Sequence, residues 1–223
     1  IIGFVIWLRF KQILAIEKLK AGLAADLHDN IGSGLTEISI LSELSANSAK
    51  TFSKDVANQI EEISEKARQL VDNMSDIVWF INPSRDTIFD FAVRLKDSYA
   101  DLLHQLGIHF KTVNLDKLKS LKLPLNYKQN LYLIFKEALN NAIKHSNCKR
   151  IEFRAEMREN KLFLCLSDDG DGIDEEKDHQ GNGLINMKKR AEEIGGNLMI
   201  DSGDKGTRIE FIGIIKKSFK LNN

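Results

Sequence analysis

Two long segments in the N-terminal half repeat their apolar residues at helical spacing. Residues 11–45 contain no proline, and their apolar positions recur every three or four residues, which predicts an amphipathic helix. After a small polar connection at 45–54, residues 56–82 alternate spacings of four and three, as a heptad seam does. Pro83 should end this second helix just before it. The two seams are Leu23, Leu27, Ile31, Leu35, Ile38, Leu41 and Leu44, and then Val56, Ile60, Ile63, Ala67, Leu70, Met74, Ile77 and Ile81.

Two such helices joined by a short connection form a helical hairpin. A single hairpin cannot bury both seams well, whereas two hairpins can do so in a four-helix bundle. We therefore expect residues 11–82 to form a homodimer through a dimeric four-helix bundle.

Beyond Pro83 the pattern changes to a mixture of helical and alternating segments. It predicts one amphipathic helix over 86–106, a strand in 107–114, a helix over 126–146 capped by Asn126, a hairpin over 150–170, a helix near 183–195, a turn at 195–196, and strands at 197–202 and 206–215. Elements in this order predict an α+β fold, an α/β sandwich with helices on one face of a mostly antiparallel sheet.

The chain opens with eight uncharged residues, followed by Arg9 and Lys11. This run is too short to cross a bilayer, which takes about 20 residues. No basic segment precedes it, so it is a poor signal peptide. We expect residues 1–10 to be the end of a membrane helix, with Trp7 at the interface. The alternative is an apolar helix start that packs on a partner.

Composition and charge narrow the function classes only slightly. Of the 223 residues, 43% are hydrophobic and 29% charged, as is typical of a globular protein. The formal net charge is zero, so nothing points to direct binding of nucleic acid. Cys148 and Cys165 match no metal-ligand spacing, and Cys165 lies in an apolar run. We expect two buried free thiols, which weakly favours a reducing compartment.

The first group with chemical potential lies in the segment "IFKEALNNAIKHS". Glu137 and Asn141 are four residues apart and share one helix face. Asn141 offers a hard oxygen ligand of the kind that suits Mg²⁺ held together with phosphates. Lys144 and His145 add positive or donor groups one turn further on. By itself this pattern is also that of an ordinary solvated helix face.

The second group is "SDDGDGID", where a strand ends in Asp168 and is followed by Gly170 and Gly172. A carboxylate at a strand end can accept a hydrogen bond from an adenine amino group, and the glycines let the backbone approach the base. An acidic turn is the plain alternative. A calcium loop is also conceivable, but the spacing lacks the alternation and the terminal glutamate of an EF-hand.

Two further pieces follow along the chain. A polar loop at 174–183 leads into "GNGLINM", in which Gly181 and Gly183 precede Leu184 at the start of a helix. Phosphates bind backbone N–H groups at such helix starts, although no Walker sequence is present. Thr207 begins the last strand, where it could hold Asp168 or a bridging water.

In this order and spacing, the pieces together resemble the ATP-binding domain of histidine kinases and their GHKL relatives, over residues 87–214. The resemblance implies a Bergerat-type domain that uses ATP and Mg²⁺. It implies that Asn141 binds Mg²⁺, that Glu137 supports the metal or its water, and that Lys144 and His145 face the phosphates. It also implies an adenine pocket formed by Asp168, Gly170 and Gly172, and a lid that hinges at Gly181 and Gly183.

The segment "AADLHDNIGSGLTEI" in turn resembles the dimerisation and phosphoacceptor helix of DesK/NarX-type sensor kinases. The resemblance implies that His28 attacks the γ-phosphoryl group of ATP, while Asp29 orients the imidazole and takes up its proton. Small residues near His28, Gly32 among them, would leave clearance for approaching domains. Ser33 stands where the subfamily usually carries a glutamine, whose role, by the same resemblance, is to position water for dephosphorylation of the receiver, so we expect weak or absent phosphatase activity.

We therefore expect this chain to be the kinase region of a sensor in the bacterial cytoplasmic membrane. This region would lie in the cytoplasm, with a response-regulator receiver domain as its partner. We expect a membrane stub at 1–10, a dimerisation and phosphotransfer domain at 11–82, a hinge at 83–90, a catalytic domain at 91–216 and a tail at 217–223. A GHKL ATPase and a non-catalytic ATP-binding scaffold remain alternatives.

Overall fold

The computed structural model describes residues 2–50, 53–173 and 182–215. The chain forms two compact units, Ile1–Arg85 and Asp86–Asn223. The division between them falls inside the segment expected to be a hinge. Gly181 and the expected tail at 217–223 lie outside the described residues.

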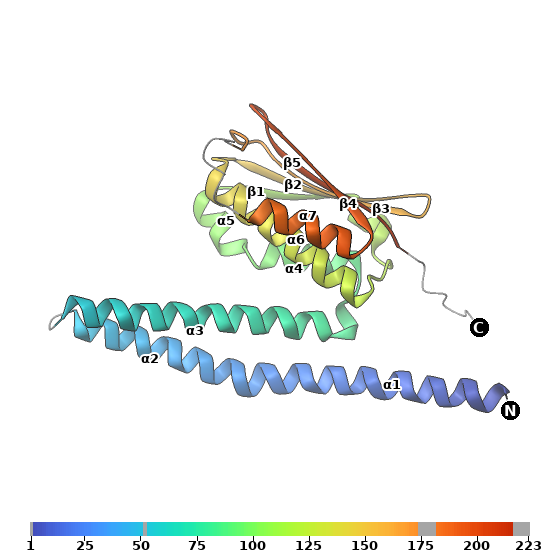
Figure 1. The fold of residues 1–223 in the computed structure, drawn as a ribbon, viewed down its shortest axis with the longest axis horizontal. Coiled ribbons are helices and arrows are strands. Elements are labelled where there is room, and N and C mark those ends of the chain that lie inside the picture. The colour runs from blue at the N-terminus through green and yellow to red at the C-terminus, as the bar shows by residue number, and fades with distance from the viewer. Residues whose placement is uncertain (1, 51–52, 174–181, 216–223) are drawn as a thin grey trace. The chain divides into compact units, whose positions relative to one another are not determined.

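The first unit is an antiparallel helical hairpin (Figure 1). Helix α1 (Ile2–Asp26) continues through a π-helical segment, η1 (Leu27–Gly32), into α2 (Ser33–Ala49), and α3 (Lys54–Ile81) returns alongside α2. The Ser53 side chain caps α3 by accepting a hydrogen bond from Val56 N at 3.4 Å. The first helix thus begins earlier and ends later than the expected range of 11–45. Within the described residues, no helix has the length and apolar character needed to cross a bilayer.

The heptad seam of α3 divides into two stripes. Ala67 and Met74 are buried in the hairpin, whereas the residues at the other heptad position are about half exposed in the single chain. These exposed residues are Val56, Ile63, Leu70 and Ile77. They form one continuous stripe because they are spaced by seven residues, or two helical turns.

The second unit is built on a five-stranded sheet in the order β1-β2-β3-β5-β4. Strands β1 (His109–Val113) and β2 (Arg150–Arg158) are parallel, and all other pairs are antiparallel. The remaining strands are β3 (Lys161–Asp168), β4 (Gly196–Gly203) and β5 (Gly206–Ile214). Figure 1 shows α4 (Ile88–Asp97), α5 (Ala100–Leu106), α6 (Leu125–His145) and α7 (Gly183–Glu193) on one face of the sheet. The expected α+β class is therefore confirmed.

The helix expected over 86–106 is in fact two helices, α4 and α5. The hydroxyl of Ser98 donates back to the Arg94 carbonyl at 2.8 Å, and Tyr99 takes φ −125° and ψ 7°, outside the helical region. The Ser98 hydroxyl also lies 3.1 Å from the hydroxyl of Tyr132 on α6, so a tertiary contact holds the break. The apolar pattern continues across the break, which is why the sequence did not reveal it.

Helix α6 begins at Leu125, one residue before the expected cap. Pro124 holds the N-cap position, and its carbonyl accepts the hydrogen bond of Lys128 N at 2.9 Å without any side-chain cap. The role predicted for Asn126 is therefore wrong. Proline is suited to this place because its fixed φ fits a helix start and its missing N–H is not needed there.

Three buried phenylalanines fix α6 to the sheet. The ring centroids of Phe135 on α6 and Phe153 on β2 are 5.3 Å apart in an edge-to-face arrangement, and Phe91 of α4 packs on both rings at 6.2 and 5.8 Å. Aromatic pairs of this kind contribute roughly 0.5–1.5 kcal/mol each beyond area burial. They set the height and rotation of α6, and so determine where its polar residues Glu137–His145 point.

Candidate functional site

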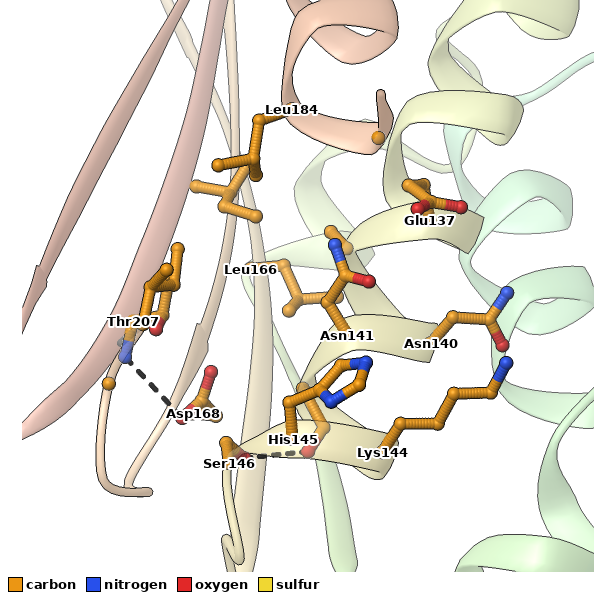
Figure 2. Close-up of a pocket in the computed structure, with 16 residues that line it drawn as sticks. Glu137, Asn140, Asn141, Lys144, His145, Ser146, Leu166, Asp168, Leu184 and Thr207 are labelled. Atoms are coloured by element: carbon orange, nitrogen blue, oxygen red, sulfur yellow. Dashed lines mark hydrogen bonds between the residues drawn. The ribbon is translucent and has the colours of Figure 1, made fainter. Parts of the chain in front are cut away.

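A cavity of about 560 Å³ lies beside α6 in the second unit (Figure 2). Its volume is within the usual range for small-molecule sites. Its walls come from α6, the ends of β3 and β5, the segment after β3 and the start of α7. The structure brings together here nine of the residues singled out from the sequence: Glu137, Asn141, Lys144, His145, Asp168, Gly172, Gly183, Leu184 and Thr207.

Asp168 ends β3 with its carboxylate held by the backbone. Its Oδ1 accepts hydrogen bonds from Gly170 N at 2.9 Å and from Thr207 N at 3.4 Å. Both donors bind the same oxygen, so Oδ2 can still accept a hydrogen bond from a ligand. Thr207 does hold Asp168, as one alternative suggested, but through its backbone N–H. Its hydroxyl instead lies 3.1 Å from Ser202 Oγ.

The two glycines after Asp168 allow close approach between protein segments. A Cβ at Gly170 would lie 2.5 Å from Ser146 Cβ and 2.7 Å from the Ser146 carbonyl carbon, at the end of α6. Gly172 has φ +81°, and a Cβ there would lie 2.6 Å from the Gly203 carbonyl oxygen. Any side chain at either position would push the loop away from the cavity wall. The structure thus supplies a reason for these glycines that the sequence reading did not give.

Three polar residues that were not among the predicted site residues hold the same loop in place. Asp169 Oδ1 accepts hydrogen bonds from Arg150 N at 2.7 Å and Lys149 N at 2.8 Å, and these backbone donors, Arg150 first, lower the pKa of Asp169. Ser146 O accepts from Asp171 N at 2.8 Å, and Ser202 Oγ accepts from Ile173 N at 2.7 Å. Ser202 and Ser146 carry no sequence signal, because serine in a strand or at a helix end is common.

The polar residues of α6 divide between two directions. Figure 2 shows Asn141 and His145 towards the strands that carry Asp168 and Thr207, whereas Asn140 and Lys144 extend from the other side of the helix. Glu137 faces the start of α7, where a Cβ at Gly183 would lie 2.5 Å from its Oε1. A carboxylate there is near the positive end of the α7 dipole. One end of the cavity can therefore recognise a base, and the other offers donors and a cation.

The backbone of His28 and Asp29 lies in η1, the π-helical segment of the first unit. Their side chains are outside the described part of the structure. π-Helical segments are rare and occur frequently at functional sites, because they insert an extra residue into a helix turn.

The glycines near His28 differ in their surroundings. Gly32 is buried, and a Cβ there would lie 2.7 Å from Met74 Cε on α3. A Cβ at Gly34 would meet no neighbouring atom within 4 Å. The clearance expected at Gly32 is therefore largely filled by Met74 within the hairpin, whereas the space at Gly34 is open in the single chain.

Family comparisons agree with both halves of this arrangement. Residues 20–86 match the HisKA_3 model, described as histidine kinase, and residues 126–215 match the HATPase_c model of histidine kinase-, DNA gyrase B- and HSP90-like ATPases. This chain belongs to the histidine kinases. Its HisKA_3 region places it in the DesK/NarX-like group.

Individual histidine kinases resemble the chain over most of its length. It is 30% identical to the sensor histidine kinase ComP of Bacillus subtilis (strain 168), over 89% of this chain and 26% of ComP. It is 29% identical to the sensor protein VraS of Staphylococcus aureus (strain COL), over 91% of this chain and 56% of VraS. The chain thus spans about a quarter of ComP and just over half of VraS.

Solved histidine kinase structures share the fold. The histidine kinase domain of the Erythrobacter litoralis EL346 blue-light activated kinase aligns with a TM-score of 0.51 at 18% identity, covering 79% of this chain and 94% of that one. Full-length ShkA in complex with AMPPNP aligns with a TM-score of 0.55 at 14% identity, covering 86% and 45%.

Proposed function

We propose that this chain is the kinase region of a sensor histidine kinase, which transfers the γ-phosphoryl group of ATP to His28 and then to an aspartate of a response regulator. The observation that carries the proposal is the cavity that unites Asp168 and Asn141 in the HATPase_c region, in one chain with a histidine–aspartate pair in the HisKA_3 region.

ATP fits the cavity by the polarity of its two ends. Oδ2 of Asp168 would accept a hydrogen bond from the adenine amino group, while Oδ1 stays bound to Gly170 N and Thr207 N. Lys144 and His145, at the end of α6, would face the phosphates. Support also comes from ShkA, which shares this fold and was solved with the ATP analogue AMPPNP.

The side chains of Asn141 and Glu137 suit Mg²⁺ if phosphate oxygens of the nucleotide supply its remaining ligands. Among the described residues, no group of three or more His, Cys, Asp or Glu side chains could hold a metal by itself. Mg²⁺ commonly takes only one or two protein ligands beside substrate phosphates and water. Asn141 would supply its amide oxygen, and Glu137 would support the metal or a bound water. The ion would offset negative charge on the phosphates.

The transfer step needs a neutral imidazole at His28. Its unprotonated ring nitrogen attacks the γ-phosphorus, a nitrogen–phosphorus bond forms, and the bond from the γ-phosphorus to the bridging oxygen of ADP breaks. The imidazole becomes cationic, and Asp29 takes up the proton from the other ring nitrogen. Histidine suits this role because its pKa near neutrality leaves much of it unprotonated in the cell. A receiver aspartate then accepts the phosphoryl group.

We also propose that the chain acts as a homodimer. The stripe of Val56, Ile63, Leu70 and Ile77 is about half exposed in the single chain and has the seven-residue period of a bundle interface. On α2, Ile38, Leu41 and Leu44 are similarly exposed. A second hairpin would bury these exposed residues of α2 and α3 and complete a four-helix bundle.

The start of α1 supports a membrane connection. Phe4, Trp7 and Phe10 are exposed, and Lys11 Nζ lies 4.3 Å from the Trp7 ring centroid. An apolar helix with an aromatic residue followed by basic residues is typical of the cytoplasmic end of a membrane helix. We propose that this region lies in the cytoplasm, at the bacterial cytoplasmic membrane.

A single labelling experiment separates the readings. The chain is incubated with γ-labelled ATP and Mg²⁺, and the protein-bound label is tested for stability. Acid-labile, alkali-stable label that is lost in His28→Gln supports the kinase. Released phosphate without labelled protein indicates an ATPase, and neither product indicates a non-catalytic scaffold. Either of the latter results, obtained with a dimeric and ATP-saturated chain, contradicts the proposed function.

A further inference from the structure

Asn140 lies beside the proposed metal ligand Asn141, yet it faces a different partner. It lines the cavity, and its Oδ1 accepts a hydrogen bond from the Tyr99 hydroxyl at 2.8 Å. Tyr99 belongs to the break between α4 and α5, 41 residues earlier in the chain. None of the site residues read from the sequence included either side chain.

The break holds Tyr99 at a defined position against α6. Ser98 Oγ lies 3.1 Å from the hydroxyl of Tyr132, which is completely buried on α6. Two consecutive residues therefore contact two positions of the same helix, Ser98 at Tyr132 and Tyr99 at Asn140. The Asn140 amide is thereby oriented from outside its own helix.

This hydrogen bond favours one kind of chemistry at Asn140. An asparagine amide has an oxygen with two lone pairs and two N–H donors. Because Tyr99 occupies one lone pair and fixes the amide plane, both N–H donors stay available to a ligand while the oxygen keeps only part of its acceptor capacity. Lys144 is four residues on, and Figure 2 shows both side chains extending from the same side of α6. A donor beside a cation suits an anion rather than a metal ion.

We propose that Asn140 donates a hydrogen bond to a phosphate oxygen of the nucleotide, with Tyr99 as the positioning residue. This inference rests on the proposed binding of ATP. The two adjacent asparagines then have opposite roles: Asn141 presents oxygen to Mg²⁺, and Asn140 presents N–H to the phosphates. The phosphate end of the site is thus coupled to the α4–α5 break.

The test is calorimetric titration of the whole chain with adenosine, ADP and ATP, each with Mg²⁺ and with a chelator. Asn140→Ala should weaken ATP binding about tenfold, as expected for loss of a hydrogen bond to a charged group. Adenosine binding should change less than about twofold, and the loss should persist with chelator. Tyr99→Phe should weaken ATP binding about threefold, because the amide loses its fixed orientation.

Two further variants sharpen the test. Asn140→Asp separates the donor role from a metal-ligand role, because a carboxylate repels phosphates but would strengthen binding of Mg²⁺. We expect ATP affinity to fall further than in Asn140→Ala. Tyr127→Phe is the matched control, because it removes a hydroxyl bound to the Ile214 carbonyl at 2.8 Å, and Tyr127 is not among the residues that line the cavity. Its ATP affinity should equal that of the wild type.

The contrary results are distinct. Equal losses for adenosine and ATP would make Asn140 a structural residue, and tighter Mg²⁺–ATP binding by Asn140→Asp would make it a metal ligand. Wild-type affinity in Asn140→Ala would remove the phosphate contact while leaving the kinase proposal intact. A wild-type chain that fails to bind ATP would overturn the proposed function and this inference with it.

Discussion

Replacing Gly170 with alanine should damage the proposed nucleotide site by pushing the loop after β3 away from the end of α6. The added Cβ would lie 2.5 Å from Ser146 Cβ and 2.7 Å from its carbonyl carbon, and closer still to its carbonyl oxygen. Ordinary contact begins at 3.4 Å, and most of the opposing atoms belong to backbone that cannot rotate away. The loop must therefore move from the end of α6 by about an ångström or more.

That movement affects two hydrogen bonds as well as packing. Asp171 N would separate from the Ser146 carbonyl, now at 2.8 Å, and Gly170 N would shift relative to Asp168 Oδ1, now at 2.9 Å. Overpacking of this kind costs about 1–3 kcal/mol. We expect a loss of about 2 kcal/mol in the free energy of unfolding, or a fall in Tm of about 8 °C for a unit of this size. Since Asp168 moves with the loop, ATP affinity should fall at least about tenfold.

The matched control is Gly203→Ala, at the last residue of β4. A Cβ at Gly203 meets no atom within 4 Å, so both Tm and ATP affinity should stay near wild type. Thermal unfolding followed by circular dichroism and calorimetric titration with Mg²⁺–ATP measure the two quantities. If Gly170→Ala matches Gly203→Ala in both, close packing of the loop on Ser146 does not shape the site, and the reasoning is refuted.

Three further predictions concern other parts of the structure. Burial raises the pKa of the Cys148 and Cys165 thiols, so both should stay protonated at pH 8. A thiol reagent should therefore label them only after urea unfolds the chain, and fast labelling of the folded chain would contradict this. Ser33→Gln should speed dephosphorylation of a phosphorylated receiver, measured by phosphate release, whereas rapid release by the wild type that is lost in Ser33→Ala would show that serine already does this work. Asp86→Asn should lower the free energy of unfolding in urea by about 3 kcal/mol, because Lys128 is only 1% exposed and loses a carboxylate partner at 2.9 Å; Lys128→Met should cost less, because Asp86 is 27% exposed and can be hydrated.

The sequence predicted best those features that depend on local period and spacing. A period of about 3.5 predicted the helices of the hairpin, and a period of 2 predicted the β2–β3 pair with β3 ending near Asp168. The grouping of Asp168 with Asn141 came from motif order, since nothing in either segment alone requires the other. The structure shows them lining one cavity, because α6 packs on the sheet through Phe135 and Phe153.

Features that depend on tertiary contacts were not predictable. The seven-residue period of α3 marks apolar positions but does not say which neighbour covers them. In the single chain, Ala67 and Met74 pack within the hairpin while Ile63 and Leu70 stay about half exposed. Likewise the break at Tyr99 leaves the apolar period intact, because the break results from the contact of the preceding serine with α6.

The adjacent acids Asp168 and Asp169 show why residue type alone could not assign the site. Asp168 is the last residue of β3 and Asp169 follows it, and both accept backbone hydrogen bonds through Oδ1. They differ in location: Asp169 binds the start of β2 and is not among the residues that line the cavity, whereas Asp168 lines it beside Thr207. Alternation along a strand sends neighbouring side chains to opposite faces, so only one of two consecutive acids at its end can face the helices. The burial pattern of the whole strand, rather than the acidic pair, therefore indicates that Asp168 lies on the cavity side and Asp169 does not.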